Sequence, residues 1–184
     1  MLSTPPVINK EIILERSWKK LSIRDIEETI SSDFPGKKEF IEFYLAFNGG
    51  CFTNGAYLYS DIFYKNFNRD YLPIEINSFL HIPLLNDNSE SKYTTDINKV
   101  IERRELLSED FEEFILFHIP FADNYADNDF WIDIQTGAIK YMDYETSYDP
   151  KDAIIVAPLF SEFCKKLQAK RRVSPNWPQT GADM

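Results

Sequence analysis

The chain has 184 residues, with 30 acidic and 20 basic side chains and a formal net charge of −10. Hydrophobic residues make up 43% of it, including 15 Phe, 10 Tyr and 3 Trp, so the chain can bury a sizeable core and is not expected to be disordered. Its acidity argues against a nucleic-acid partner, because phosphate binding needs Lys and Arg to displace counterions. A basic protein partner suits such a surface, since complementary charge speeds encounter.

The length fits one domain, which we expect over residues 1–172, followed by a flexible tail over residues 173–184. No apolar run approaches the roughly 20 residues that a membrane-spanning helix needs. The opening MLSTPPVINKEIILERSW lacks the layout of a secretion signal. Cys51 and Cys164 are the only cysteines, and two isolated thiols make no disulfide framework or zinc motif. We therefore expect a cytoplasmic protein with reduced thiols and no cofactor or membrane contact.

Two helices are expected in the first 50 residues. In SIRDIEETI, Ser22 can cap a helix with Asp25 three residues on, in the capping-box position. The stronger helix is FPGKKEFIEFYLAFNGG, which ends at Asn48-Gly49-Gly50 because Asn and Gly tolerate the left-handed cap conformation. Its apolar face has the spacing i, i+3, i+4 and i+7, formed by Phe40, Phe43, Tyr44 and Phe47.

Strands dominate the middle of the chain. From Cys51 to Leu85 the pattern is rich in Phe, Tyr and Ile, and Asn54-Gly55 predicts the tight turn of a hairpin. A polar loop leads to a helix from about Asp96 to Leu107 and to a short acidic helix that begins at Glu109.

The last third is expected to hold strands and one closing helix. FILFHIPF predicts a buried strand, and DFWIDIQTGAIKYMDYE predicts a hairpin with Gln135-Thr136-Gly137 at its bend. APLFSEFCKKLQAKRR predicts the closing helix, with one apolar face made of Phe160, Phe163, Cys164 and Leu167.

Acidic residues cluster before this hairpin. Between Glu105 and Ile139 there are nine Asp or Glu and no Lys or Arg. The stretch IPFADNYADNDFWID alone contains four of them, Asp123, Asp127, Asp129 and Asp133. A calcium loop of the EF-hand type needs D-x-[DN]-x-[DN]-G, and neither frame of this stretch satisfies that pattern. The two histidines, His81 and His118, each lie in an apolar stretch and do not indicate a zinc or iron site.

The strand period places these carboxylates on a defined face. Asp129, Trp131 and Asp133 share one face of the expected strand, and the alternate apolar residues share the other. We expect the apolar face to meet the core and the aspartates to lie in water, where nothing raises the pKa of a catalytic acid. No nucleophile or phosphate-loop motif occurs elsewhere, so no catalytic residue and no metal ligand is assigned.

Turn formation accounts for Asp123-Asn124 and Asp127-Asn128, because Asx side chains hydrogen-bond to the nearby backbone. It does not account for Trp131. That side chain either packs under another element or stands exposed among acids, as the anchor of a binding site does.

The order of these pieces resembles the SUKH superfamily over roughly residues 23–167. The resemblance rests on EFIEFYLAFNGG, then strands, then HIPFADNYADNDFWIDIQTGAIKYMDYE, then LFSEFCKKL. The superfamily includes fungal regulators of cell-wall synthesis and bacterial immunity proteins that neutralise toxins. The resemblance implies one α+β domain, a mixed or antiparallel sheet with helices packed around it, and no catalysis. Two positions depart from the pattern: Asn128 stands where a glycine is usual, and Ala157-Pro158 where a small hydroxyl residue begins the closing helix.

We therefore expect a non-enzymatic protein-binding domain, and foremost an immunity protein that blocks a basic toxin domain through an acidic surface. The expected partner-binding residues are Asp123, Asp127, Asp129, Trp131 and Asp133, with Tyr141, Asp143 and Glu145 on the second strand of the hairpin. One alternative is a regulatory adaptor that docks on housekeeping or cell-wall synthesis enzymes. The other is a metal-dependent hydrolase built on the cluster from Asp123 to Asp133.

Overall fold

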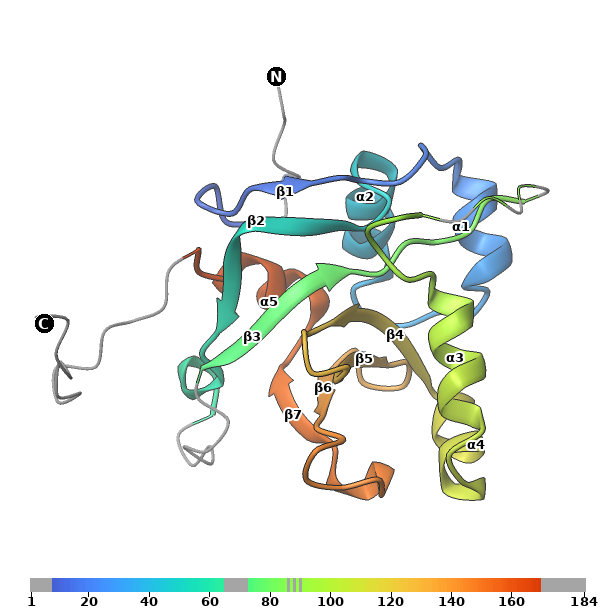
Figure 1. Ribbon diagram of the computed structural model, residues 1–184, viewed down its shortest axis with the longest axis vertical. Helices are drawn as coiled ribbons and strands as arrows, with labels where there is room; N and C mark the ends of the chain where they lie inside the picture. Colours follow the sequence, from blue (N-terminus) through green and yellow to red (C-terminus); the bar gives the residue numbers. More distant parts are fainter. Residues whose placement is uncertain (1–7, 65–72, 86, 88, 90, 170–184) are drawn as a thin grey trace, which may run out of the picture.

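The computed structural model describes residues 8–64, 73–85, 87, 89 and 91–169. In this part of the chain, seven strands form a single antiparallel sheet in which each strand lies beside its neighbour in sequence, from β1 to β7 (Figure 1). The fold is one α+β domain with helices packed around an antiparallel sheet, as the sequence predicted. The expected tail, residues 173–184, lies outside the described residues.

The strands are β1 (Leu14–Glu15), β2 (Gly50–Leu58), β3 (Ile74–Phe79), β4 (His118–Asp123), β5 (Asp129–Asp133), β6 (Ile139–Met142) and β7 (Ile154–Ala157). The hairpin predicted around Gln135-Thr136-Gly137 is confirmed as β5 and β6, which pair with Phe130 opposite Tyr141.

The helices are α1 (Ile23–Thr29), α2 (Lys37–Ala46), α3 (Ile97–Glu105), α4 (Glu109–Ile115) and α5 (Phe160–Lys166), with short 3-10 helices η1 (Ser60–Ile62) and η3 (Pro150–Asp152). The predicted capping box is present, because Ser22 accepts a hydrogen bond from the Asp25 amide and Asp25 accepts one from the Ser22 amide. Asp96 caps α3 and Ser108 caps α4, each through one hydrogen bond that its side chain accepts from the amide three residues on. By contrast, α5 begins without a side-chain cap.

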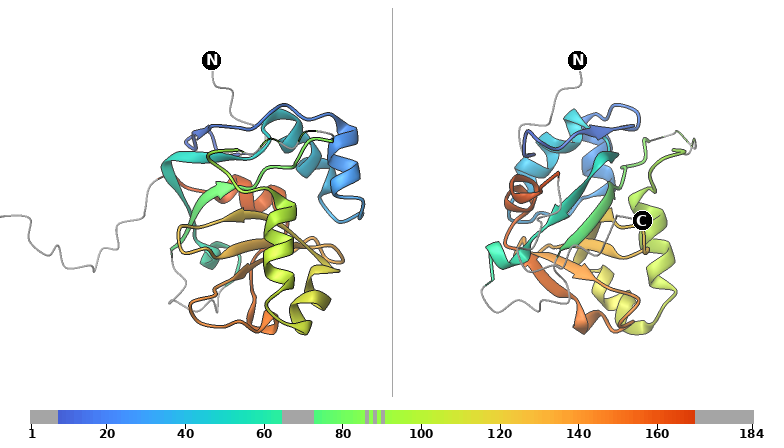
Figure 2. Two further views of the ribbon diagram at one scale, coloured as in Figure 1. Left: turned by 45° about the vertical axis from the view of Figure 1, so that its right-hand side comes forward. Right: turned by 60° about the vertical axis from the view of Figure 1, so that its left-hand side comes forward.

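Helices cover both faces of the sheet (Figure 2). On one face, α2 and α5 pack against the sheet through aromatic rings, and Phe163 of α5 meets Phe130 of β5 with ring centroids 5.5 Å apart. On the other face lie α3 and α4, where Phe114 meets Trp131 edge to face at 5.4 Å. Phe130 and Trp131 are neighbours on one strand and therefore point to opposite faces. Since both faces are covered, both sets of β5 side chains are buried.

Two local predictions are wrong. Asn54-Gly55 forms no hairpin turn; β2 runs through it, and the register against β3 shifts between Cys51 and Ala56. Gly55 has φ +72, so the left-handed residue is used in a bulge and not in a turn. The strand predicted in FILFHIPF begins only at His118. Ser108 caps a helix whose inward side chains, Phe111 and Phe114, continue it to Ile115.

Candidate functional site

The face of β5 that was expected to be exposed is covered by α3 and α4. Asp129, Trp131 and Asp133 do share this face, but Trp131 and Asp129 are each 0% exposed. The expectation that the aspartates of this face lie in water is therefore wrong for Asp129. The alternative that Trp131 packs under another element is the one that the structure shows, with Phe114 of α4 as the covering residue. Neither Trp131 nor Asp129 is accessible to a partner in this fold.

Asp129 is held by residues of its own chain. Arg104 of α3 donates from Nε to Asp129 Oδ2 over 2.6 Å, and the Tyr144 hydroxyl donates to the same oxygen over 2.9 Å. The Arg104 guanidinium also lies 4.0 Å from the centroid of the Tyr144 ring. Burial raises the pKa of Asp129, and the hydrogen bond and charge of Arg104 counteract that effect. The group is an internal ion pair that joins α3 to the sheet.

Asp127 lies at the turn between β4 and β5 and is more than half exposed. Its Oδ1 is 2.9 Å from Nη2 of Arg103, and its Oδ2 is 3.2 Å from Nη2 of Arg104. Its φ is +61, so the left-handed residue of this turn is Asp127 and not Asn128. These ion pairs occupy the carboxylate that was expected to face a partner.

The two asparagines of the turn make the hydrogen bonds expected of Asx residues. Asn124 Oδ1 accepts from the amides of Ala126 and Asn128, at 2.9 and 3.0 Å. Asn128 donates to the Tyr141 hydroxyl over 3.0 Å and accepts from the Tyr144 amide over 2.8 Å. Tyr141 is buried and belongs to this structural network, so its expected exposure on the hairpin is wrong.

Asp123 and Asp133 end their strands and also have partners within the chain. Asp123 accepts a hydrogen bond from the Ser78 hydroxyl over 2.6 Å, and burial raises its pKa to about 6. Asp133 accepts from the amides of Gln135 and Thr136 and lies 3.1 Å from Lys140 Nζ. Burial raises the pKa of Asp133, but these contacts outweigh it and leave the pKa below its usual value.

A half-buried cluster joins Asp133 to His118 and Lys140. His118 Nδ1 lies 2.7 Å from the Phe114 carbonyl, so this nitrogen carries the proton, and Nε2 is left to accept from Lys140 Nζ at 2.8 Å. Burial lowers the pKa of His118 to about 4, and the charge of Lys140 adds to that effect. A neutral histidine that accepts a hydrogen bond from a lysine holds the first residue of β4 in place. It is not arranged as a general base.

Of the eight expected residues, Glu145 is exposed and Asp143 is half-buried on the segment that follows β6. Other acidic side chains, missed by the sequence reasoning, stand on the outer face of α4. We define the α4 acidic surface as Glu109, Asp110, Glu112 and Glu113, all exposed. The sequence did contain an indication of this surface. Phe111 and Phe114 are three residues apart on a helix and point inward, so the residues between and before them point outward.

Exposed apolar side chains flank this surface at both ends of α4. Leu106 is 87% exposed, Leu116 70% and Phe117 42%. Asp110 lies 3.5 Å from Lys151 of η3, and Phe111 contacts Tyr144, so the segment after β6 lies beside α4. The four acidic side chains therefore lie between exposed apolar side chains at the two ends of the helix.

No family model, curated protein or solved structure matches this chain. Within the described ranges, no three His, Cys, Asp or Glu side chains are grouped so that they could hold a metal ion. None of the helices in those ranges is long and apolar enough to span a membrane.

Proposed function

We propose that this protein is a non-enzymatic binding domain that recognises a basic protein partner through the α4 acidic surface. The observation that carries the proposal is the combination of four exposed acids on a seven-residue helix with large exposed apolar side chains at its ends. Glu145 and Asp143 extend the acidic area on the neighbouring segment. Trp131, which packs under α4, and Asp129, which is paired with Arg104 of α3, support the surface and do not contact the partner.

Electrostatics and apolar burial have separate roles in this interaction. The acids attract a positively charged partner from beyond contact distance, which raises the association rate and makes it sensitive to salt. Leu116 and Phe117 can then be buried in the contact, and burial of such side chains supplies most of the affinity. Because the acids are exposed, their pairwise contacts alone contribute little to the affinity.

The resemblance to SUKH proteins supports a more specific proposal, in which the partner is a basic toxin domain and this protein is its immunity protein. Neutralisation is then steric: the domain covers the toxin's functional surface and carries out no reaction. This part of the proposal rests on the resemblance described above, together with the acidic surface. It fits the net charge of −10, which disfavours nucleic acid as the ligand.

The test compares partner capture by the tagged protein with capture by two charge-matched variants. Glu112→Lys/Glu113→Lys reverses two charges on α4. The control Glu27→Lys/Glu42→Lys makes the same change in net charge at exposed positions on α1 and α2. We expect one stoichiometric basic protein that the control retains and the α4 variant loses, and that is toxic when it is expressed alone.

Surface plasmon resonance with that partner separates the two roles. The α4 variant should associate at least about tenfold more slowly at low salt, and Leu116→Ser should mainly speed dissociation. Equal loss of binding in the α4 variant and in the control would show that net charge alone drives capture and would contradict the assigned surface. Capture of several housekeeping enzymes would instead support the interpretation that the protein is a regulatory adaptor and not an immunity protein.

A further inference from the structure

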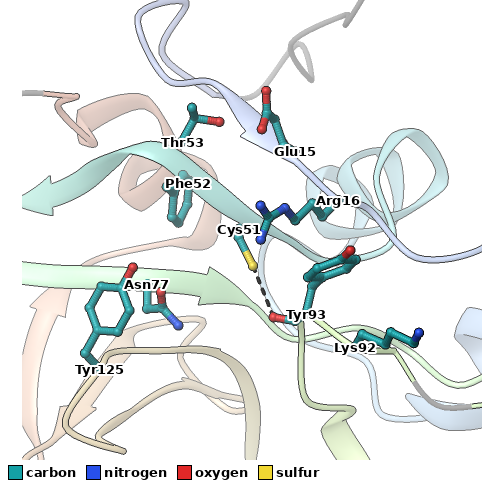
Figure 3. A pocket seen from close by; sticks show the side chains of 9 residues that line it. All are labelled: Glu15, Arg16, Cys51, Phe52, Thr53, Asn77, Lys92, Tyr93 and Tyr125. Atoms are coloured by element: carbon teal, nitrogen blue, oxygen red, sulfur yellow. Dashed lines mark hydrogen bonds between the residues drawn. The ribbon is translucent and has the colours of Figure 1, made fainter.

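A groove with a volume of about 420 Å³ lies beside β1, β2 and β3 (Figure 3). We call it the Arg16 groove; it is lined by Glu15, Arg16, Cys51, Phe52, Thr53, Asn77, Lys92, Tyr93 and Tyr125. These residues come from five separate parts of the chain, which is why no sequence motif indicates the groove. Its volume falls within the range of small-molecule sites, which is about 300–1,000 Å³.

Arg16 places a cation in this groove at a conformational cost. Its φ is +58, a left-handed conformation that L-residues other than Gly and Asn rarely adopt. The guanidinium carbon lies 4.5 Å from the centroid of the Tyr93 ring, which fixes the side chain over β2. Among the described residues, no carboxylate lies within ion-pair distance of Arg16. Its donors are therefore oriented and free to bind an anion.

Aromatic side chains stand on the two sides of the groove. Arg16 and Tyr93 lie on one side, and Tyr125 lies beside Asn77 on the other, with Cys51 between them (Figure 3). Tyr125 is 79% exposed and Tyr93 53%, so both side chains leave apolar area in contact with solvent. A flat ring can pack against such a surface, and the Asn77 amide can hydrogen-bond at its edge.

The floor of the groove is suited to binding and not to covalent chemistry. The Cys51 thiol donates a hydrogen bond to the Tyr93 carbonyl over 3.1 Å. Burial raises the pKa of this thiol, and the charge of Asp123 raises it further. Because the thiolate is the nucleophile, a thiol with a raised pKa is unreactive.

The charge balance decides which anion fits. Arg16 and Lys92 bring two positive charges, and Glu15 brings one negative charge. Asp123 is near enough to Cys51 for its charge to raise the pKa of that thiol, and it is hydrogen-bonded to Ser78 next to Asn77. The side chains that line the groove therefore carry a net charge of about one positive, and ionised Asp123 lowers it further, which suits one carboxylate better than a doubly charged phosphate. The planar guanidinium matches a carboxylate through two parallel hydrogen bonds.

We propose that the Arg16 groove binds a small aromatic monocarboxylate, whose carboxylate pairs with Arg16 and whose ring packs on Tyr125. This site is separate from the α4 acidic surface, since no residue of α4 lines the groove. Loss of one function by mutation leaves the other to be measured in the same protein.

The test titrates the full-length protein with 4-hydroxyphenylacetate and follows binding by saturation-transfer NMR and calorimetry. Two probes of similar shape define the chemistry: the neutral 4-hydroxyphenylacetamide and the dianion phenyl phosphate. We expect the acid to bind, the amide to bind at least about tenfold more weakly, and phenyl phosphate to bind no more tightly than the acid.

Variants then locate the site. Arg16→Asn removes the cation, and because Asn tolerates positive φ the fold should melt at an unchanged or higher temperature. Affinity for the acid should fall at least about tenfold in Arg16→Asn and in Tyr125→Ala, and should persist in Tyr148→Ala, which truncates an exposed tyrosine outside the groove. Equal affinity for acid and amide, undiminished binding in Arg16→Asn, or absence of binding at millimolar acid would each overturn the proposal.

Discussion

Arg104 of α3 and Asp129 of β5 form a buried ion pair, with Nε and Oδ2 2.6 Å apart and both side chains almost entirely removed from solvent. Asp129 belongs to the acidic stretch from Asp123 to Asp133, and at this point the stretch packs against α3. Arg104 also donates to the backbone carbonyl of Asp127 over 2.5 Å, so one guanidinium holds both the strand and the turn before it. The aspartates of this stretch thus dock a helix of the same chain.

Removal of one member of this pair should be far more costly than replacement of both. Arg104→Met leaves the Asp129 carboxylate buried without its counterion, and we expect the free energy of unfolding in urea to fall by about 3–5 kcal/mol. The double variant Arg104→Met/Asp129→Leu removes both charges and should recover most of that loss. Costs that simply add in the double variant would contradict a coupled pair.

The Tyr144 hydroxyl should contribute a smaller amount to the same network. Tyr144→Phe removes the donor to Asp129 Oδ2 and leaves a buried carboxylate with one hydrogen bond fewer, which costs about 1–3 kcal/mol. The matched control is Tyr148→Phe, because Tyr148 is 65% exposed, and its unfolding free energy should not change. Equal effects in the two variants would exclude the hydroxyl contact as the cause.

The spacing of apolar residues correctly predicted which side chains share a face of a helix or strand. It could not predict which other element covers that face. On α2, the spacing identified Phe40, Phe43 and Tyr44 as a buried face, and all three are 0% exposed. On β5, the same reasoning placed Asp129 and Trp131 together on one face. Whether that face meets water depends on where α3 and α4 pack, which is a tertiary relationship that a period of two does not contain.

The partner of Asp129 could not be predicted for a related reason. Arg104 lies 25 residues away, on a helix whose last turn also carries Arg103. A basic residue near a helix C-terminus is ordinarily explained by the helix dipole, so the sequence alone does not indicate that Arg104 is buried. The groove around Arg16 shares this difficulty, since the lining residues meet only in the folded chain.

Gly49, in the turn that follows α2, should be much harder to replace than Gly36, which precedes that helix. An added Cβ would lie 2.8 Å from the Phe79 carbonyl oxygen and 2.9 Å from the His81 amide nitrogen, and φ is +66. Gly36 is the control, because its φ is +88 but an added Cβ meets only Leu159 at 3.9 Å. We expect Gly49→Ala to lower unfolding free energy by about 1–3 kcal/mol more than Gly36→Ala, as measured by urea titration. Equal losses would mean that conformation alone, without the backbone contact, sets the cost.

Asp123 and His118 should have opposite effects on stability over the same pH range. Asp123 has a folded pKa of about 6 against an ordinary value of 3.8, so the folded state holds the extra proton and stability falls as pH rises through this window. His118 has a folded pKa of about 4 against 6.5, so the unfolded state holds the extra proton and stability rises with pH. Each pKa shift corresponds to a change of roughly 3 kcal/mol in the free energy of unfolding. Because the two changes have opposite sign, they nearly cancel.

Single variants should reveal each effect. Asp123→Asn keeps an acceptor for Ser78 and leaves the His118 effect unopposed, so the unfolding free energy should rise between pH 4.5 and 6.5. His118→Gln leaves the Asp123 effect unopposed, so its unfolding free energy should fall over the same range. The unfolding free energy of the wild type should change less than that of either variant. Asp129 and Asp133 contribute in all three proteins, so differences in slope isolate the two groups. Urea titrations at half-unit pH steps measure these slopes, and parallel curves for the three proteins would rule out the opposed pair.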